Sequence, residues 1–260
     1  MEDNTKWKQE HTCSSAKGVS KMKFVEKLKQ KQTDNFGTRN PMIAFLGDSV
    51  TQGCFEVWEE NGLCRTLFNT RESYSEKVKQ VFALLYPEAP VNVVNAGVNG
   101  SSASEGLDRL RRDVICCKPD LLVVCFGLND ANNGKGVEAY TDALRTIFQE
   151  AKEAGMEVIF MTPNMMNTYT SRANDEQLFK DLAVEFGGRQ LDGTFDSYIE
   201  AAKKVATEED VVICDCYADW KKMYECGVDT TRLLSNGLNH PVKEMHWLFA
   251  WQLVNTILYK

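Results

Sequence analysis

The sequence has little of several features that define other classes of protein. It contains 6 prolines and 17 glycines in 260 residues, which excludes collagen-like and proline-rich disordered chains. It has no apolar run of about 18 residues, so no spanning helix is expected. The first eight residues, MEDNTKWK, lack the apolar segment of a secretory signal peptide. We therefore expect a cytoplasmic protein.

Positive charge is also scarce. The chain has 30 Lys and Arg against 37 Asp and Glu, which gives a net charge of −7. A nucleic-acid-binding surface would need a basic patch, and an anionic membrane would repel this chain overall. We therefore expect a small-molecule or carbohydrate ligand, with no nucleic-acid partner and no membrane insertion. The sequence does not define the oligomeric state.

The nine cysteines are an odd number and include no Cys-x-x-Cys pair. In the absence of an export signal, this pattern favours reduced thiols over a disulfide framework. A zinc site built from Cys214, Cys216 and Cys226 is a weak alternative, because Cys214 lies in an apolar strand pattern where a free thiol packs like a small hydrophobe. We expect neither a metal nor an organic cofactor.

From residue 41 onward, short apolar segments alternate with helical ones. Strands are predicted at 42–46, 91–95, 120–126, 157–162 and 211–214, and helices at 74–86, 104–116, 137–154, 174–187, 193–207, 218–224 and 242–258. Short apolar strands separated by helices indicate a parallel sheet that is covered on both faces. The fold class predicted is therefore α/β, a three-layer α/β/α sandwich with five parallel strands. The long 163–210 connection could form a small cap.

We expect two regions along the chain. Residues 1–40 are rich in Lys, Gln, Ser and Thr and form an N-terminal extension. Only Met22–Gln32 has helical spacing there, with a thin apolar stripe of Phe24, Val25 and Leu28. We expect this extension to be partly helical and to pack on the domain or stay partly mobile. Residues 41–260 form the domain itself.

Small polar residues follow the predicted strands. Gly47-Asp48-Ser49, Asn95 to Gly100, Gly127 to Asp130 and Pro163-Asn164 each come directly after one strand. In an open parallel sheet, ligands bind beyond the carboxyl ends of the strands, so these segments should meet at one edge. Of the three histidines, His11 lies in the extension and His246 at a helix start. His240, in a turn before the last helix, is the best candidate for a base.

These residue types suit acyl transfer. A serine needs a neighbouring base to take its proton, and the tetrahedral oxyanion needs two or three donors aimed at one point. Ser49 and His240 could supply the nucleophile and the base. The N–H groups of Ser49 and Gly100 and the side chain of Asn129 could supply the donors. Asp48 and Asn164 are candidates for contact with substrate.

The four segments resemble the blocks of the SGNH (GDSL-like) hydrolase superfamily of esterases and acylhydrolases. Gly47-Asp48-Ser49-Val50 is similar to the family's Gly-Asp-Ser-Leu, Asn95 to Ser102 contains its oxyanion glycine, Gly127-Leu128-Asn129-Asp130 matches Gly-x-Asn-Asp, and His240-Pro241 stands in the last block. The order of the blocks spans residues 42–258. The resemblance implies a flavodoxin-like sheet, Ser49 as nucleophile, Gly100 and Asn129 as oxyanion donors, His240 as base, and 41–260 as an SGNH hydrolase domain.

One departure concerns the acid of the triad. The family has Asp three residues before the histidine, and here that position is Gly237, preceded by Asn236. A main-chain carbonyl near Gly237 or another acceptor could orient the imidazole instead, or Asp229 could fold back to reach His240.

Each candidate also has a purely structural interpretation. Ser49 could cap a helix, Asp48 could bond loop amides, and Asn129 and Asn164 could serve as a cap and in a turn. Gly97 and Gly100 could permit positive φ, and His246 could pack at its helix start.

The chemistry expected is that of a serine esterase or acylhydrolase that forms an acyl-enzyme and cleaves short acyl esters, with acetyl on a sugar as the leading substrate. Lysophospholipid or thioester hydrolysis is an alternative. A non-catalytic binding module on a hydrolase scaffold is another, and the missing Asp is the feature that favours it.

Overall fold

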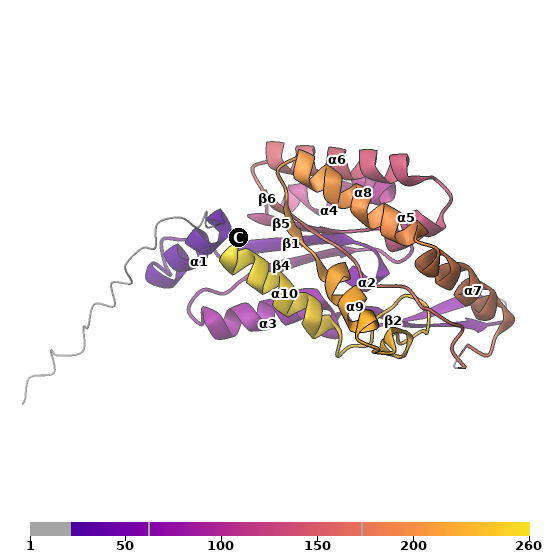
Figure 1. Cartoon of the computed structure of the whole chain (residues 1–260). Helices are drawn as coiled ribbons and strands as arrows, with labels where there is room; N and C mark the ends of the chain where they lie inside the picture. The colour runs from indigo at the N-terminus through magenta and orange to yellow at the C-terminus, as the bar shows by residue number, and fades with distance from the viewer. Residues whose placement is uncertain (1–21, 62, 173) are drawn as a thin grey trace, which may run out of the picture.

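A computed structural model of the chain describes residues 22–61, 63–172 and 174–260, and the residues before 22 lie outside it. A five-stranded parallel sheet with the order β4-β1-β5-β6-β7 forms the middle layer (Figure 1). Its strands are β1 (Met42–Gly47), β4 (Asn92–Gly97), β5 (Leu121–Cys125), β6 (Glu157–Met161) and β7 (Val212–Cys214). All five coincide with predicted strands to within three residues at each end. The structure therefore confirms the α/β/α sandwich.

Helices cover both faces of this sheet. One face carries α4 (Ala103–Asp113), α6 (Val137–Glu153) and α8 (Thr194–Glu208), which pack in that order. The other carries α3 (Tyr74–Leu85) and α10 (His246–Tyr259), with α9 (Cys216–Glu225) beside α10. Shorter segments are α2 (Ser49–Gln52), α5 (Leu128–Asn132), η1 (Thr70–Glu72), η2 (Ile115–Cys117) and η3 (Thr230–Leu233). Within the described part of the chain, no helix combines the length and apolar character needed to cross a membrane.

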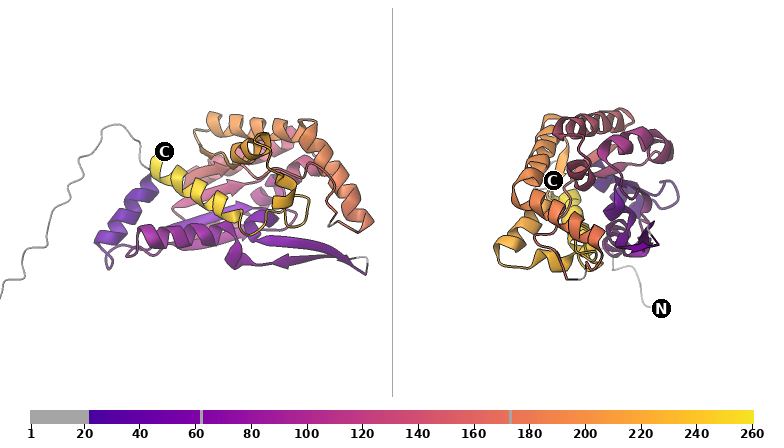
Figure 2. Two further views of the ribbon diagram at one scale, coloured as in Figure 1. Left: turned by 60° about the horizontal axis from the view of Figure 1, so that its bottom comes forward. Right: turned by 90° about the vertical axis from the view of Figure 1, so that its right-hand side faces the viewer.

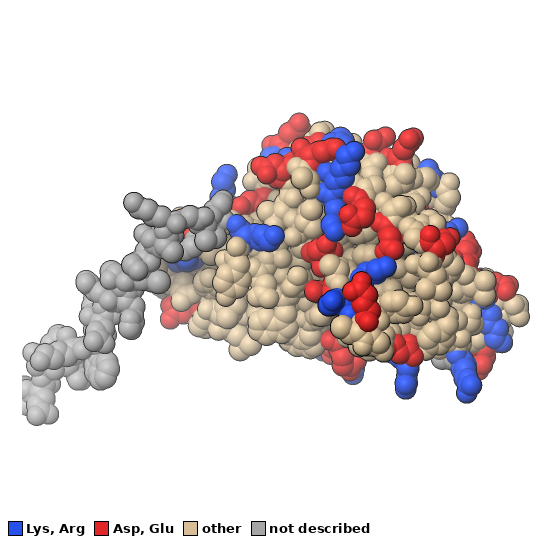
Figure 3. Space-filling view, in the orientation of Figure 1, with Lys and Arg blue, Asp and Glu red and all other residues tan. Residues whose placement is uncertain are grey.

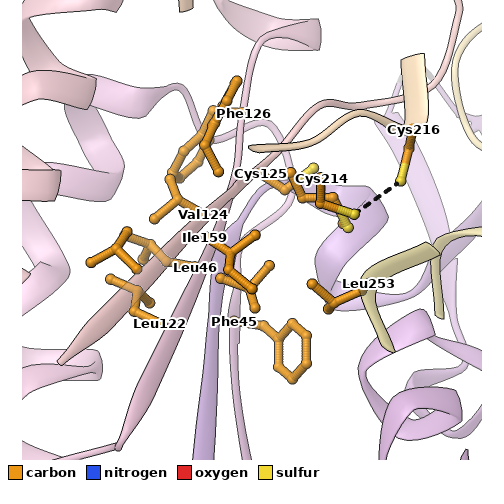
Figure 4. Packing of buried hydrophobic residues seen from close by; sticks show 14 of the residues in the cluster. Phe45, Leu46, Leu122, Val124, Cys125, Phe126, Ile159, Cys214, Cys216 and Leu253 are labelled. Atoms are coloured by element: carbon orange, nitrogen blue, oxygen red, sulfur yellow. Dashed lines mark hydrogen bonds between the residues drawn. The ribbon is translucent and has the colours of Figure 1, made fainter. Parts of the chain in front are cut away.

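The core lies between the central strands and both helix layers. Every residue of β5 is buried, as are the last five of β1, because each strand is covered on two faces. Figure 4 shows Phe45 of β1 and Leu253 of α10 on one side of the strands, and Leu122 and Val124 of β5 on the other. Cys214 and Cys216 are buried in the same core with their sulfur atoms 3.8 Å apart, while Cys226 is exposed. The three thiols proposed as a zinc site therefore do not converge.

The stripe predicted in the N-terminal extension packs against the domain. Helix α1 (Lys23–Thr33) buries Phe24, Val25 and Leu28 in the main core. The carboxylate of Glu157, at the start of β6, accepts the N–H groups of Lys23 (2.8 Å) and Phe24 (2.6 Å). This satisfies donors in the first turn of the helix, which have no partner within it. The described part of the extension is thus fixed to the sheet.

A β-hairpin of β2 (Cys54–Glu60) and β3 (Leu63–Phe68) was not predicted. It extends beyond the carboxyl edge of the sheet, and α7 (Gln177–Leu191) lies across from it (Figure 2). Val57 of the hairpin packs against Phe179 and Ala183 of α7. The sequence signal was the Asn61-Gly62 pair, because Asn-Gly between two strands is the strongest short-range signal for a tight hairpin.

Charges of both signs are mixed on the face shown in Figure 3. Lys and Arg side chains alternate with Asp and Glu, and no continuous basic stripe crosses this face.

Candidate active site

The strand register brings the predicted site residues together. Gly47 at the end of β1 is paired with Gly97 of β4 on one side and with Cys125 of β5 on the other. Ser49, Gly100 and Asn129 follow these three paired residues by two to four positions. They therefore leave the sheet at adjacent points of one edge, as expected for the ligand-binding edge of a parallel sheet.

The turn from β1 into α2 presents Ser49 at the first helical position. The Asp48 carboxylate accepts the Val50 N–H at 2.9 Å and caps the helix. A Cβ on Gly47 would overlap the Thr51 hydroxyl, and a Cβ on Gly97 would overlap the backbone of Gln52. Close approach of the backbone thus requires both glycines. The expectation of positive φ is wrong for Gly97 but correct for Gly100, whose φ is +75°.

Ser49 and His240 are in direct contact although 191 positions separate them. The Ser49 Oγ lies 2.8 Å from Nε2 of His240, on the loop that precedes α10. Both residues are buried, with 3% and 4% of their surface exposed. When the hydroxyl donates to Nε2, the neutral imidazole carries its proton on Nδ1. This is the arrangement in which a histidine can take the proton of a serine.

Three groups at the same edge can each donate a further hydrogen bond. The N–H groups of Ser49 and Gly100 bind no protein acceptor among the described residues. Asn129 donates one amide hydrogen from Nδ2 to the Ser101 carbonyl at 3.0 Å, and its second hydrogen is left over. Free N–H groups at a helix start and in a glycine turn are the donors that an oxyanion requires.

Arg109 of α4 donates hydrogen bonds to the strand ends at this edge, a role that was not predicted from the sequence. Its guanidinium is 7% exposed and donates to the carbonyls of Gly47 (2.8 Å) and Ala96. It also lies 3.4 Å from the Ser101 hydroxyl. One buried side chain therefore ties the ends of β1 and β4 to the segment that holds Asn129. No sequence signal marks this role, because Arg109 lies off the apolar stripe of Leu107, Leu110 and Val114 on the predicted 104–116 helix.

Two buried carboxyl groups shape the loops. Burial raises the pKa of Asp48 to about 7 and that of Asp130 to about 6. Asp130 accepts the Ala103 N–H at 2.9 Å and so joins α5 to the start of α4. Asp130 therefore braces these two segments, and Asp48 acts likewise within its own turn.

The expectation that Asp48 and Asn164 contact substrate is not supported. Asp48 is 1% exposed and its carboxylate is used by the α2 cap. Asn164 is fully buried, and its Nδ2 donates to the carbonyls of Met165 and Asn239, both at 2.8 Å. Asn164 therefore braces the His240 loop from strand β6.

The loop that carries His240 is organised by Asn236. Its Oδ1 accepts the N–H groups of Leu238 (3.0 Å), Asn239 (3.0 Å) and His240 (2.9 Å). The alternative in which Asp229 reaches His240 is wrong. Asp229 instead caps η3 through the Arg232 N–H and accepts the Tyr169 hydroxyl at 2.9 Å. Position 237 therefore has no carboxylate, and the Asp229 carboxylate is bound elsewhere, so neither orients the imidazole.

Burial dominates the electrostatics of the two described histidines. It lowers the pKa of His240 to about 4, while the main-chain carbonyl of Phe55 acts in the opposite direction. Nδ1 of His240 is buried and has no hydrogen-bond partner among the described residues. His246 packs at the start of α10, as expected, and its Nδ1 accepts the Tyr74 N–H at 3.0 Å. Burial lowers the pKa of His246 to about 3.

The described residues contain no group of three or more His, Cys, Asp or Glu side chains arranged to hold a metal ion. The chemistry available at this edge is that of a serine, a neutral histidine and N–H donors on adjacent segments.

Fold and site together define a serine-type hydrolase on an α/β/α sandwich. Residues 45–248 match the model of the GDSL-like lipase/acylhydrolase family, and the chain belongs to that family. It is a carboxylic ester hydrolase, as the resemblance of its sequence blocks implied.

Individual relatives are named for esterase and acylhydrolase activities. An acetylxylan esterase of Geobacillus stearothermophilus is 24% identical over 222 residues, which cover 80% of this chain and 90% of that protein. Its crystal structure is similar with a TM-score of 0.62 and 21% identity over 85% of this chain and 95% of that one. Thioesterase 1/protease 1/lysophospholipase L1 of Escherichia coli is 30% identical over 101 residues, 38% of this chain and 49% of that protein.

Proposed function

We propose that this esterase removes acetyl groups from a carbohydrate, with Ser49 as nucleophile and His240 as general base. The observation that carries the assignment of roles is the 2.8 Å contact between Ser49 Oγ and His240 Nε2 beside three N–H donors. The acetylxylan esterase, which matches 80% of the chain, supports the substrate class.

The proposed reaction has two halves. Ser49 Oγ attacks the ester carbonyl while Nε2 of His240 takes its proton, and the oxyanion is held by the N–H groups of Ser49 and Gly100 and by the Asn129 amide. The intermediate collapses with loss of the alcohol, which receives the proton from His240. Water, deprotonated by the same imidazole, then attacks the acetyl-serine and releases acetate. Ser49 regains its proton in that step.

The alcohol half has a candidate position beside the His240 loop. A hollow of about 210 Å³ lies between β2 and this loop, and its lining residues are Glu56, Val57, Trp58, Asn174, Ser235 and Asn236. Trp58 is 40% exposed. A hollow with amide, hydroxyl and carboxylate groups and an exposed indole suits a sugar ring better than an acyl chain. The group that protonates the leaving alcohol, His240, lies on the same loop.

Ester hydrolysis with graded substrates tests this function. We expect p-nitrophenyl acetate to be cleaved fastest, with activity falling from acetyl to palmitoyl, and acetylated xylo-oligosaccharides to release acetate. Ser49→Ala should abolish all turnover, whereas Ser197→Ala, an exposed serine on α8, should not. Trp58→Ala should raise KM for the oligosaccharide and leave p-nitrophenyl acetate unchanged.

The outcomes separate the proposals. Activity that rises with chain length would favour lipid acylhydrolysis, for which the matched relative covers only 38% of the chain. Ser49-dependent turnover without a preference for acetyl sugars would leave the residue roles intact and refute the substrate. A protein that a fluorophosphonate probe does not label at Ser49 would refute the nucleophile.

A further inference from the structure

The position at which the family places the orienting acid cannot hold a carboxylate here. Gly237 has φ +63°, a conformation that side chains rarely adopt. A Cβ at this position would lie 2.9 Å from the Cβ of Ser171 and 3.2 Å from the Asn174 side chain. The preceding Asn236 has its Oδ1 committed to three backbone N–H groups. The orienting group must therefore come from elsewhere in the fold.

A β-bulge in the hairpin supplies an unpaired main-chain group at this place. Cys54 pairs with Phe68 and Glu56 pairs with Leu67, so Phe55 is an extra residue between two successive pairs. A bulged residue is left out of the ladder, and bulges often redirect groups toward active sites. The Phe55 carbonyl accepts the Ser235 hydroxyl instead of a strand partner.

Ser235 connects this carbonyl to the histidine loop. Its hydroxyl also lies 3.1 Å from the His240 carbonyl, and its own N–H donates to that carbonyl at 2.7 Å. The ring of Phe55 is anchored on the other side by His246, with centroids 4.9 Å apart. The bulge is thus held between the loop of His240 and the buried start of α10.

We propose that the Phe55 carbonyl, presented by the bulge and held by Ser235, replaces the orienting carboxylate of the triad. In the resting enzyme, Nδ1 of His240 is buried and has no hydrogen-bond partner among the described residues. Catalytic hydrogen bonds are often long in the free enzyme and tighten as charge develops. When His240 takes the Ser49 proton, the imidazolium N–H donates to the carbonyl dipole. Ser235 is then a positioning residue, and the pair Ser49–His240 works as a dyad.

The proposal makes a prediction about tautomers that does not depend on turnover. The proposal requires Nε2 of His240 to accept from Ser49, with the proton on Nδ1. Nδ1 of His246 accepts the Tyr74 N–H, so its proton is on Nε2. Nitrogen-15 spectra of histidine-labelled full-length protein distinguish the two forms. His240→Gln and His246→Gln assign the signals. A His240 ring protonated on Nε2 would overturn the proposal.

Kinetics test the role of Ser235. With p-nitrophenyl acetate, which has no sugar to fill the hollow lined by Ser235, we expect Ser235→Ala to lower kcat about ten-fold with little change in KM, because the carbonyl is no longer held toward the imidazole. Since this carbonyl raises the pKa of His240, the acid limb of the rate profile should also move to lower pH. Ser235→Thr, which keeps the hydroxyl, should restore both, and Ser197→Ala should match the wild type.

Two results would overturn this role: an unchanged kcat in Ser235→Ala, or a lower kcat with an unmoved acid limb, which a merely structural serine would give. The proposal rests on the Ser49–His240 pair as nucleophile and base. Fluorophosphonate labelling of the wild type but not of Ser49→Ala establishes that pair first. Failure of the dyad is then distinguishable from failure of the orienting carbonyl.

Discussion

The burial of His240 predicts an esterase that stays active in acid. A general base works only when neutral, and burial lowers its pKa from 6.5 to about 4, which corresponds to about 3 kcal/mol against the charged form. At pH 5.5 an ordinary histidine would be neutral in about one molecule in ten. With its pKa at about 4, His240 is neutral in about 97% of molecules at that pH.

The assay is kcat/KM for p-nitrophenyl acetate from pH 8 down to about pH 4.5, followed at an isosbestic wavelength of nitrophenol. We expect a near-constant value across this range, with the acid limb only at its lower end. Asp48 adds a second titration, because its pKa is raised to about 7. Asp130 adds a third titration, because its pKa is raised to about 6. Asp48→Asn and Asp130→Asn each remove one carboxyl titration, so a bend that persists in both variants belongs to the histidine.

A ten-fold loss of kcat/KM between pH 7.5 and 5.5 in the wild type, in Asp48→Asn and in Asp130→Asn would refute the argument. It would mean that water reaches the imidazole and that His240 titrates as an exposed histidine. Circular dichroism at each pH separates this outcome from acid unfolding.

Three further predictions concern stability and the scaffold. Arg109→Leu should lower the free energy of unfolding by about 3 kcal/mol and abolish activity, because it leaves the carbonyls of Gly47 and Ala96 buried without donors; urea unfolding measures it. Gly237→Asp should lower Tm and kcat together, because the fold has no room for the side chain; a gain in kcat would contradict this. His246 stays neutral in the fold with a pKa of about 3, so the unfolded chain binds a proton that the folded one does not as pH falls below 6.5. Stability should therefore fall about 3 kcal/mol less in His246→Gln than in the wild type between pH 6.5 and 4. Loss of the Tyr74 contact lowers the stability of the variant equally at both pH values and cancels from this difference.

The layer architecture was predictable because it depends on burial patterns along the chain. Segments such as 120–126 are apolar throughout, and only a strand covered on both faces needs that composition. The hairpin escaped prediction because its strands are largely exposed and mix charged with apolar residues, so neither periodicity stands out. Only its turn signal at 61–62 was informative.

The site was predictable where side-chain identity carries the chemistry. Ser49, His240 and Asn129 are chemically distinctive, and parallel strands bring their segments to one edge without further information. Arg109 was missed because an arginine on a helix is usually exposed, and its burial depends on two carbonyls from strands that are distant in sequence.

The group that we propose to orient His240 could not be predicted from the sequence, because it is a main-chain carbonyl. A main-chain carbonyl is present in every residue, so no residue type marks the one at Phe55. Its availability depends on a strand register with one extra residue, and register is a property of the pairing between β2 and β3. What the sequence does show is that the usual acid is missing, because Gly237 stands where the family has Asp. The absence of the acid follows from the shape of the turn. Because this turn places Asn236 under the amides of the loop, position 237 adopts a conformation that glycine favours. Inserting an acid without rebuilding that turn should therefore not restore a triad, whereas removing the Ser235 hydroxyl should weaken the dyad.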